Sequence, residues 1–312
     1  MEAEDEWMHY CEEPRTKQFV LCNLKDLKDV PTRKYQVPYD SLYLFDTVQI
    51  KNMIYFSGGG APATDTSPEQ FYQIMMRVTI KPTMDTVLDK LSNMNTLRAN
   101  HAMVAANAKL LYVAGGTNCT GNLTSCEEYN IATNKWREVA QLNEKKKWIS
   151  VCAFQGRYLY TFGGALNAEA KAKSVKATDM IECLDTTDPT VKLWEIIKIT
   201  TGKELWKNCF FTGAITISDD SILLFGGIVK EAEKDDCMGF NPNKKTLEKR
   251  SSLLRPDAFY RTKPGIKAAK IVIVGSHDGD LHIYDKTKGK WDLMLKKIWN
   301  PIFGIDLKSD TF

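Results

Sequence analysis

The chain of 312 residues contains no long apolar run. A membrane-spanning helix needs ~18 or more consecutive apolar residues, so we expect no membrane insertion. Neither sign of charge dominates, because 42 lysine and arginine residues are balanced by 39 aspartate and glutamate residues, which gives a net charge of +3. Proteins that bind nucleic acid usually carry a marked basic excess, so this composition predicts no nucleic-acid partner.

Lysine and arginine are absent from the first thirteen positions, which hold six acidic residues. A secretory signal or a mitochondrial presequence requires positive charge, so we interpret residues 1–13 as an acidic tail and expect a cytoplasmic protein. The overall composition, 43% apolar and 26% charged, is typical of a globular protein with enough apolar residues for a core.

Histidine is scarce and cysteine is widely spaced. The four histidines are His9, His101, His277 and His282. His277 and His282 flank Asp278-Gly279, which is typical of a hairpin turn, so we favour a turn over a metal site. The eight cysteines show no C-x2-C pairing, and we expect reduced thiols rather than zinc ligands or a disulfide framework. The sequence therefore predicts neither a metal nor another cofactor.

Glycine, by contrast, recurs in a regular pattern. Apolar runs of the β type end in a glycine pair at 52–59, 110–116, 158–164 and 222–227, and a fifth run at 271–276 keeps one glycine; the repeat recurs about every 50 residues. The glycines are Gly58, Gly59, Gly115, Gly116, Gly163, Gly164, Gly226, Gly227 and Gly275. Glycine adopts backbone angles closed to other residues and permits close approach of neighbouring chains, so we interpret these glycines as structural. A phosphate-binding loop is disfavoured, because no pair precedes a Gly-Lys-Ser/Thr sequence.

An aromatic pair follows several of these glycines. Tyr129 precedes Trp136 by seven positions, and Tyr284 precedes Trp291 by seven, with polar residues between them. This spacing predicts a strand, a tight polar turn and a second strand.

These glycines and aromatic residues, in this order, resemble the kelch-repeat family over nearly the whole chain. The amino-acid sequence of residues 98–152 looks closest to the sequences of kelch-motif proteins of ciliates and other protists. The resemblance implies an all-β fold, a six-bladed β-propeller whose blades are four-stranded sheets.

Three tryptophan segments, 148–154, 206–211 and 299–305, look like one element, the approach to the innermost strand of a blade. After the third segment the chain ends before another glycine pair. We therefore expect N-terminal strands at 18–24 and 33–37 to complete the last blade, because a closed ring leaves no strand edge exposed. Whether residues 7–11 form a further strand stays open. Residues 14–312 would then form a single propeller domain.

In kelch propellers, the loops that lead into the inner strands share one face with the loops that leave the glycine pairs, and family members commonly bind peptides there. The candidate partner-binding residues on this face are Arg98, Asn100, Lys146, Lys147, Trp148, Lys207, Asn208 and Arg261. A positively charged surface of this kind favours binding of an acidic segment of a protein partner. Two simpler interpretations stay open: the lysines are solvated loop residues, and Trp148 packs between blades.

The resemblance predicts a non-catalytic scaffold or adaptor that binds other proteins as a subunit of a larger assembly, cytoskeletal or ciliary in kind. The sequence has neither the Glu-Asp-His run of iron-dependent propellers nor a nucleophile paired with a base. One alternative from another class stays open, a metal-free enzyme or binding protein for small molecules or carbohydrates, similar to sialic-acid mutarotase.

Overall fold

The computed structural model describes residues 7–11, 18–23, 32–36, 44–61, 63–81, 85–167, 175–259, 265–267, 270–275 and 280–294. Strands dominate these residues, and the one helical element among them is the 3₁₀ turn η1 (Lys203–Leu205). The expected all-β fold is confirmed. No helix within these ranges has the length and apolar character needed to cross a membrane.

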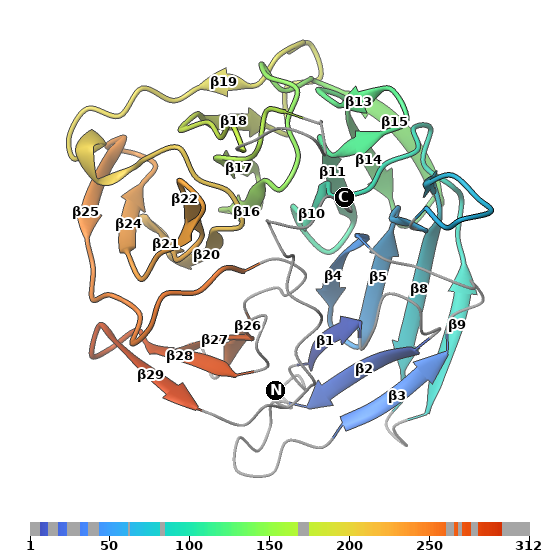
Figure 1. The fold of residues 1–312 in the computed structure, drawn as a ribbon, viewed down its shortest axis with the longest axis horizontal. Helices are drawn as coiled ribbons and strands as arrows, with labels where there is room; N and C mark the ends of the chain where they lie inside the picture. The colour runs from blue at the N-terminus through green and yellow to red at the C-terminus, as the bar shows by residue number, and fades with distance from the viewer. Residues whose placement is uncertain are drawn as a thin grey trace.

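Five antiparallel sheets of four strands form five blades around a central axis (Figure 1). Blade 1 contains β4 (Asp46–Ile50), β5 (Met53–Ser57), β8 (Met75–Ile80) and β9 (Thr86–Lys90). Blade 2 contains β10 (Ala102–Ala105), β11 (Leu110–Ala114), β14 (Cys126–Asn130) and β15 (Lys135–Val139). Blade 3 contains β16 (Ser150–Phe154), β17 (Tyr158–Phe162), β18 (Ile181–Asp185) and β19 (Glu195–Ile196).

Blade 4 contains β20 (Gly213–Ser218), β21 (Ser221–Phe225), β24 (Cys237–Asn241) and β25 (Thr246–Lys249). Blade 5 contains β26 (Gly265–Lys267), β27 (Ile271–Gly275), β28 (Leu281–Asp285) and β29 (Lys290–Met294). The first strands of blades 1 to 4 contact one another in turn around the axis, β4 with β10, β10 with β16, and β16 with β20. The fourth strand of each blade lies at the outer edge of its sheet.

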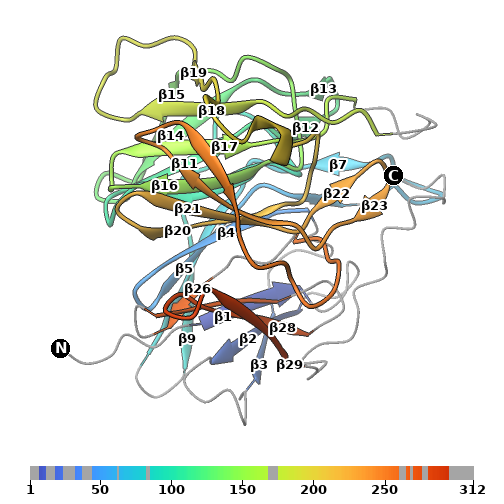
Figure 2. The ribbon, with the colours of Figure 1, turned by 90° about the vertical axis from the view of Figure 1, so that its left-hand side faces the viewer.

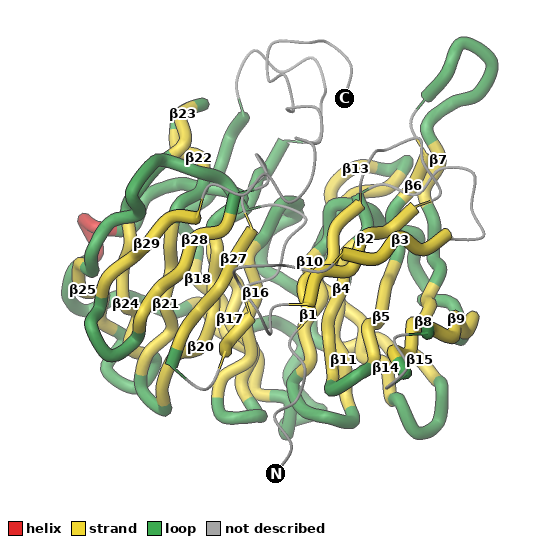
Figure 3. Tube along the Cα trace, turned by 90° about the horizontal axis from the view of Figure 1, so that it is seen from below, coloured by secondary structure: helices red, strands yellow, loops and turns green. Residues whose placement is uncertain are grey.

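Three short hairpins stand between the second and third strands of their blades. They are β6 (Gly60–Ala61) with β7 (Gln70–Phe71) in blade 1, β12 (Thr117–Asn118) with β13 (Gly121–Asn122) in blade 2, and β22 (Ile228–Val229) with β23 (Ala232–Glu233) in blade 4. All three project on the same side of the ring, at the top of Figure 3.

A separate three-stranded sheet is formed by β1 (Trp7–Cys11), β2 (Gln18–Asn23) and β3 (Thr32–Gln36). The last two strands confirm those expected at 18–24 and 33–37. The interpretation of residues 1–13 as a tail is wrong for Trp7–Cys11, because β1 pairs along its whole length with β2. The sheet lies in the sector of the ring between blade 5 and blade 1 (Figures 1 and 2).

The propeller arrangement is confirmed, but the described residues complete five blades rather than the six expected from the repeat. The segment 299–305, expected to lead into the innermost strand of the blade that the N-terminal strands complete, lies outside the described residues. The N-terminal sheet therefore has three strands where a complete blade has four.

The glycine pairs end the second strands of blades 1 to 4, and every glycine in them has a positive φ. The second glycine of each pair donates its N–H to the connection that leads to the next blade. These hydrogen bonds run from Gly59 to the Arg98 carbonyl, from Gly116 to Lys146, from Gly164 to Cys209 and from Gly227 to Asp257, at 2.8–2.9 Å. The paired glycines thus act as structural residues at the blade junctions, while Gly275 ends β27 in blade 5.

The aromatic pairs of the repeat face each other across neighbouring strands. Tyr129 on β14 is the register partner of Trp136 on β15, and Tyr284 on β28 is the partner of Trp291 on β29. The ring centroids lie 5.0 Å apart in both pairs. The predicted sequence of strand, turn and strand is confirmed at both places.

The apolar core lies between successive blades. One cluster joins blades 2 and 3 and includes Tyr112 and Trp194, and another joins blades 3 and 4 and includes Phe162 and Phe240. Trp194 also donates its indole N–H to the carbonyl of Ala140 in the preceding blade, at 2.9 Å. Each blade therefore depends on its neighbours to bury its apolar faces.

We expect Gly116→Ala to lower the free energy of unfolding by about 2–4 kcal/mol, because a methyl group would add both strain and overlap. Gly116 has a φ of 96°, and a Cβ placed there would lie 2.6 Å from the carbonyl oxygen of Ala99. Chemical denaturation would measure the loss. Gly156→Ala is the control: its φ is 64° and the nearest atom lies 3.8 Å away, so about 1 kcal/mol is expected. If Gly116→Ala and Gly156→Ala lowered the free energy of unfolding equally, the close approach of the Ala99 carbonyl to Gly116 would not be the cause of the loss.

Candidate functional site

The connections between blades meet the segments that follow the glycine pairs on one side of the ring, which we call the loop face (Figure 3). The isolated β-bridges that join them are Ala99–Thr117, Lys147–Ala165 and Phe210–Ile228. Each bridge joins the connection that leads into a blade to the segment that leaves the second strand of the same blade. The expectation that these two sets of loops share a face is confirmed.

Arg98 lies inside the protein and not on the loop face. Its side chain is fully buried and donates to the carbonyl oxygens of Gly115 and Ser125, at 2.8 and 2.9 Å, and to Glu127 Oε1 at 2.8 Å. Glu127 is equally buried and also accepts the main-chain N–H of Asn95 at 2.7 Å. The prediction that Arg98 contacts a partner is therefore wrong, because its charge is neutralised within blade 2.

Lys146 repeats this arrangement in blade 3. Its side chain is fully buried and forms an ion pair with Glu182, which also accepts the main-chain N–H of Asn143 at 2.7 Å. The prediction that Lys146 contacts a partner is wrong for the same reason. Neither glutamate was a sequence candidate. The signal that could have revealed them is a glutamate at the second position of a third strand, Glu127 in β14 and Glu182 in β18.

Other pairs occupy the equivalent positions in blades 4 and 5. Blade 4 has Cys209 and Met238, which belong to one apolar cluster. Blade 5 has Asp257 and His282, both buried, with His282 Nε2 lying 3.0 Å from Asp257 Oδ2. Arg255 also contacts Asp257 Oδ2, at 3.2 Å. One position of the repeat thus holds a different matched pair in each of these four blades.

No group of three or more histidine, cysteine, aspartate or glutamate side chains in the described part of the chain is arranged to hold a metal ion. Six cysteines are free thiols, and all of these except Cys119 are buried: Cys119, Cys126, Cys152, Cys183, Cys209 and Cys237. Burial raises the pKa of the Cys126 and Cys209 thiols to about 12, so both are protonated at neutral pH. His277 and the turn expected at 278–279 lie outside the described residues.

Asn100 and Trp148 are joined to each other on the loop face. The indole N–H of Trp148 donates to Asn100 Oδ1 at 2.9 Å, and its main-chain N–H donates to the Asn100 carbonyl at 3.0 Å. The indole ring packs against Phe210 and Phe211, with centroid separations of 5.4 and 4.9 Å. Trp148 therefore packs between blades, as one of the two simpler interpretations held, while its side chain stays only partly buried.

The Asn100–Trp148 bond is one step in a series that we call the circumferential chain. In this series Asn100 donates its N–H to the Leu44 carbonyl, Trp148 to Asn100, Phe211 to Trp148 and Phe259 to Phe211, at 2.8, 3.0, 3.4 and 2.8 Å. Leu44, Asn100, Trp148 and Phe211 have φ values of 57°, 55°, 56° and 57°. Four non-glycine residues at equivalent places in successive connections thus share the left-handed conformation.

The remaining predicted contacts differ in exposure. Lys147 is partly buried, and its Nζ lies 4.3 Å from the centroid of the Trp148 ring. Burial lowers the pKa of the Lys147 ammonium. Lys207 and Asn208 are exposed, and Arg261 lies outside the described residues.

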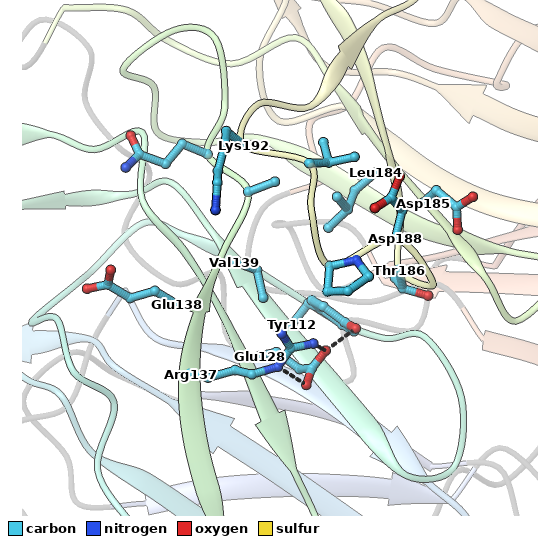
Figure 4. A pocket seen from close by; sticks show the side chains of 14 residues that line it. Tyr112, Glu128, Arg137, Glu138, Val139, Leu184, Asp185, Thr186, Asp188 and Lys192 are labelled. Carbon is cyan, nitrogen blue, oxygen red and sulfur yellow. Dashed lines mark hydrogen bonds and ion pairs between the residues drawn. The ribbon is translucent and has the colours of Figure 1, made fainter.

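A cleft with a volume of about 270 Å³ lies between blades 2 and 3, beside the outer strand β15 (Figure 4). Blade 2 contributes Tyr112, Glu128 and residues 137–141, and blade 3 contributes residues 184–186, 188, 189, 191 and 192. We call it the seam cleft. It was not among the sequence predictions.

Two ion pairs fix the polar side chains of the seam cleft. Arg137 donates to both carboxylate oxygens of Glu128, each at 2.7 Å, and the Tyr112 hydroxyl donates to the same carboxylate. Burial and this hydrogen bond raise the pKa of Tyr112, so the hydroxyl stays protonated. On the opposite wall, Arg157 Nε donates to Asp185 at 2.8 Å.

The sequence of this chain matches known proteins over part of its length. A family model described as Kelch motif matches residues 97–143, which include all four strands of blade 2. Beta-scruin of Limulus polyphemus is 27% identical over 150 residues, which are 48% of this chain and 15% of that protein. Kelch-like protein 40 of Xenopus tropicalis is 25% identical over 170 residues, 53% of this chain and 25% of that protein. The chain thus spans at most about a quarter of these relatives.

The whole fold is similar to a solved structure, that of YjhT. The two match with a TM-score of 0.68 over 94% of this chain and 97% of the other, at 13% sequence identity. At this identity the likeness concerns the fold alone.

We expect Glu127→Met to lower the free energy of unfolding by about 3–5 kcal/mol, because it leaves the buried Arg98 guanidinium without its carboxylate. The double variant Arg98→Cys/Glu127→Met copies the apolar pair of blade 4 and should lose less than the single variant. Chemical denaturation would measure both. Removing the carboxylate of the half-exposed pair Arg77–Asp89, as Asp89→Ala, should cost about 1 kcal/mol or less. A double variant that loses as much stability as Glu127→Met, or more, would contradict the coupling of Arg98 and Glu127.

Proposed function

The chain belongs to the kelch-repeat family, and on that premise we propose that it is a non-catalytic scaffold or adaptor that binds protein partners through the loop face. The observation that carries the proposal is the gathering of inter-blade connections and short hairpins on one face. Residues that bind other molecules commonly lie on loops that a rigid scaffold holds in place. The similarity to YjhT is one of fold and does not favour the small-molecule alternative.

The loop face offers a small set of groups for a partner. Asn100 and Trp148 are fixed by their mutual hydrogen bonds, and tryptophan is a favoured residue at protein interfaces. Lys147 lies against the indole ring, and Lys207 is exposed. The proposed preference for an acidic segment depends on Lys147 and Lys207, because the charges of Arg98 and Lys146 are neutralised by internal ion pairs.

The proposal also covers the setting of the protein. We place it in the cytoplasm as a subunit of a larger assembly, cytoskeletal or ciliary in kind, on the basis of the sequence resemblance. The chain spans only 15% and 25% of the two curated relatives, so their own activities and partners are not carried over.

Closure of the ring completes the proposal. We propose that β1, β2 and β3 are strands of a sixth blade that closes the ring. Two observations support this closure: the N-terminal sheet has three strands, and it lies between blade 5 and blade 1. A closed ring covers the apolar blade faces that would otherwise border the gap.

We expect Lys147→Glu/Lys207→Glu to release a partner that wild-type protein captures, because both substitutions reverse charge on the loop face without touching a buried ion pair. Chemical cross-linking followed by affinity capture and mass spectrometry would measure recovery, and at least a five-fold loss is expected. Lys198→Glu/Lys249→Glu, at exposed positions of the outer rim, makes the same change in net charge. Recovery unchanged in the first variant, or lost equally in both, would contradict the role of the loop face.

We expect deletion of residues 1–40 to lower the midpoint of a single cooperative thermal transition by at least about 5 °C, because the apolar faces of the blades on both sides of the gap become exposed. Calorimetry would measure the midpoint and the number of transitions. Deletion of residues 1–6 alone, before β1, is the control and should leave the midpoint unchanged. A remainder that melts at the wild-type temperature would contradict closure by the N-terminal sheet.

A further inference from the structure

The outer strand of blade 1, β9, has an apolar edge at the periphery of the ring (Figure 1). Val87 and Leu88 are 39% and 37% exposed, and they follow each other in the strand. Successive side chains of a strand point to opposite faces of its sheet, so an apolar side chain is exposed on each face. β9 is the last strand of its sheet, and no strand of the described chain pairs with its outer side. An edge of this kind favours pairing with a strand from another chain.

The main-chain hydrogen bonds of blade 1 determine which groups of β9 face outward. Lys81 donates its N–H to the Asp85 carbonyl at 2.8 Å, and Leu91 donates its N–H to the Met75 carbonyl at 2.9 Å. Hydrogen-bonded positions alternate along an antiparallel pair, so the odd-numbered residues from 85 to 91 bond to β8 and its flanking residues. The main-chain groups of the even-numbered residues therefore point away from the sheet, and Leu88 is the central one of these.

The outer strands of the other four blades are covered, short or charged. In blade 4 a segment from blade 3 runs beside β25, where the N–H of Leu247 donates to the Thr201 carbonyl at 2.9 Å. β19 has only two residues. β15 and β29 each have an exposed charged side chain at the centre, Arg137 and Asp292. Covering segments and charged side chains both oppose edge pairing, whereas the exposed side chains at the centre of β9 are apolar.

A second copy of the chain fits this edge. A two-fold axis relates the copies in most dimers, and in an antiparallel pair of identical strands it sets one residue opposite its own copy. Leu88 satisfies this condition, because its main chain points outward: its N–H and carbonyl can bond to the carbonyl and N–H of Leu88 in the second copy. In this register Thr86 lies opposite Lys90 of the second copy, and Val87 lies opposite Asp89.

The charges along the strand agree with this register. Asp85 precedes β9 and Lys90 ends it, so antiparallel pairing brings the acidic end of one copy beside the basic end of the other. No like charges lie opposite each other, and the Asp89 carboxylate is already held by Arg77 at 2.7 Å. An axis through Val87 would instead set Asp85 opposite Asp89 and bring together main-chain groups that already bond to β8. The strand thus favours a single self-complementary register.

We propose that the protein forms a two-fold dimer by antiparallel pairing of β9 with β9 of a second copy, with Leu88 on the axis. The pairing joins the four-stranded sheets of the two first blades into one continuous sheet. It uses the outer rim and leaves the loop face of each copy uncovered. A dimer with two loop faces would bind a partner with two sites more tightly than a monomer does, and this consequence alone rests on the function proposed for the loop face.

Sedimentation equilibrium of the full-length protein at about 1–200 µM tests the dimer, because a short strand interface is weak. Wild type should show a monomer–dimer equilibrium in this range. Leu88→Lys sets two ammonium groups opposite each other and should raise the Kd for dimer formation at least ten-fold. Leu193→Lys makes the same change at a leucine elsewhere that is 54% exposed, and it should leave the Kd unchanged. Both variants should melt at the wild-type temperature, because neither side chain is buried.

A mixing experiment tests the register. Leu88→Lys and Leu88→Glu should each be monomeric alone, but an equimolar mixture should form a heterodimer, because only pairing of residue 88 with its own copy sets the unlike charges opposite each other. A mixture that stays monomeric, or a dimer that Leu88→Lys does not weaken, overturns the pairing. A wild-type protein that is monomeric throughout the range overturns the dimer and leaves the edge to a strand of another protein. None of these results bears on the loop face, which is tested with Lys147 and Lys207.

Discussion

The circumferential chain of main-chain hydrogen bonds is the constraint on which the loop face depends. It links Leu44, Asn100, Trp148, Phe211 and Phe259 in order around the axis, one residue from each inter-blade connection. Four of these residues hold a left-handed backbone without being glycine, at a cost of about 1–2 kcal/mol each. The surrounding blades must therefore determine these conformations, and the connections have little freedom to move independently of one another.

Local signals in the sequence revealed much of the fold. The glycine pairs were recognisable because a positive φ and a close backbone approach both require glycine, as at Gly116 beside Ala99. Tyr129 and Trp136 were recognisable because a short polar turn fixes the register of the strands on either side. Features of this kind can be predicted from residues that are close together in the sequence. The number of blades is different, because it depends on how sheets from distant parts of the chain lie beside one another: the three-stranded N-terminal sheet lies between blade 5 and blade 1.

The candidate site was harder to predict because burial depends on distant residues. Arg98 and Lys146 lie in polar loop segments and resembled exposed cations, yet they are neutralised by glutamates 29 and 36 residues later in the chain. The seam cleft arises because β19 is short and the chain before Trp194 crosses to blade 2. The sequence showed that the third repeat is long. It did not show that the extra residues before Trp194 cross to blade 2.

The buried pairs of the repeat bear on how similar blades find their correct order. Three connections carry a polar residue matched to the third strand of the blade that the connection enters: Arg98 with Glu127, Lys146 with Glu182, and Asp257 with His282. A misassembled ring that placed Lys146 beside Met238 of blade 4 would bury an ammonium group with no anion, at a cost of several kcal/mol. The blades share one backbone arrangement but differ in these buried pairs. The differences thus favour the pairing of each connection with its own blade and disfavour, during folding, a ring in which blades are omitted or exchanged.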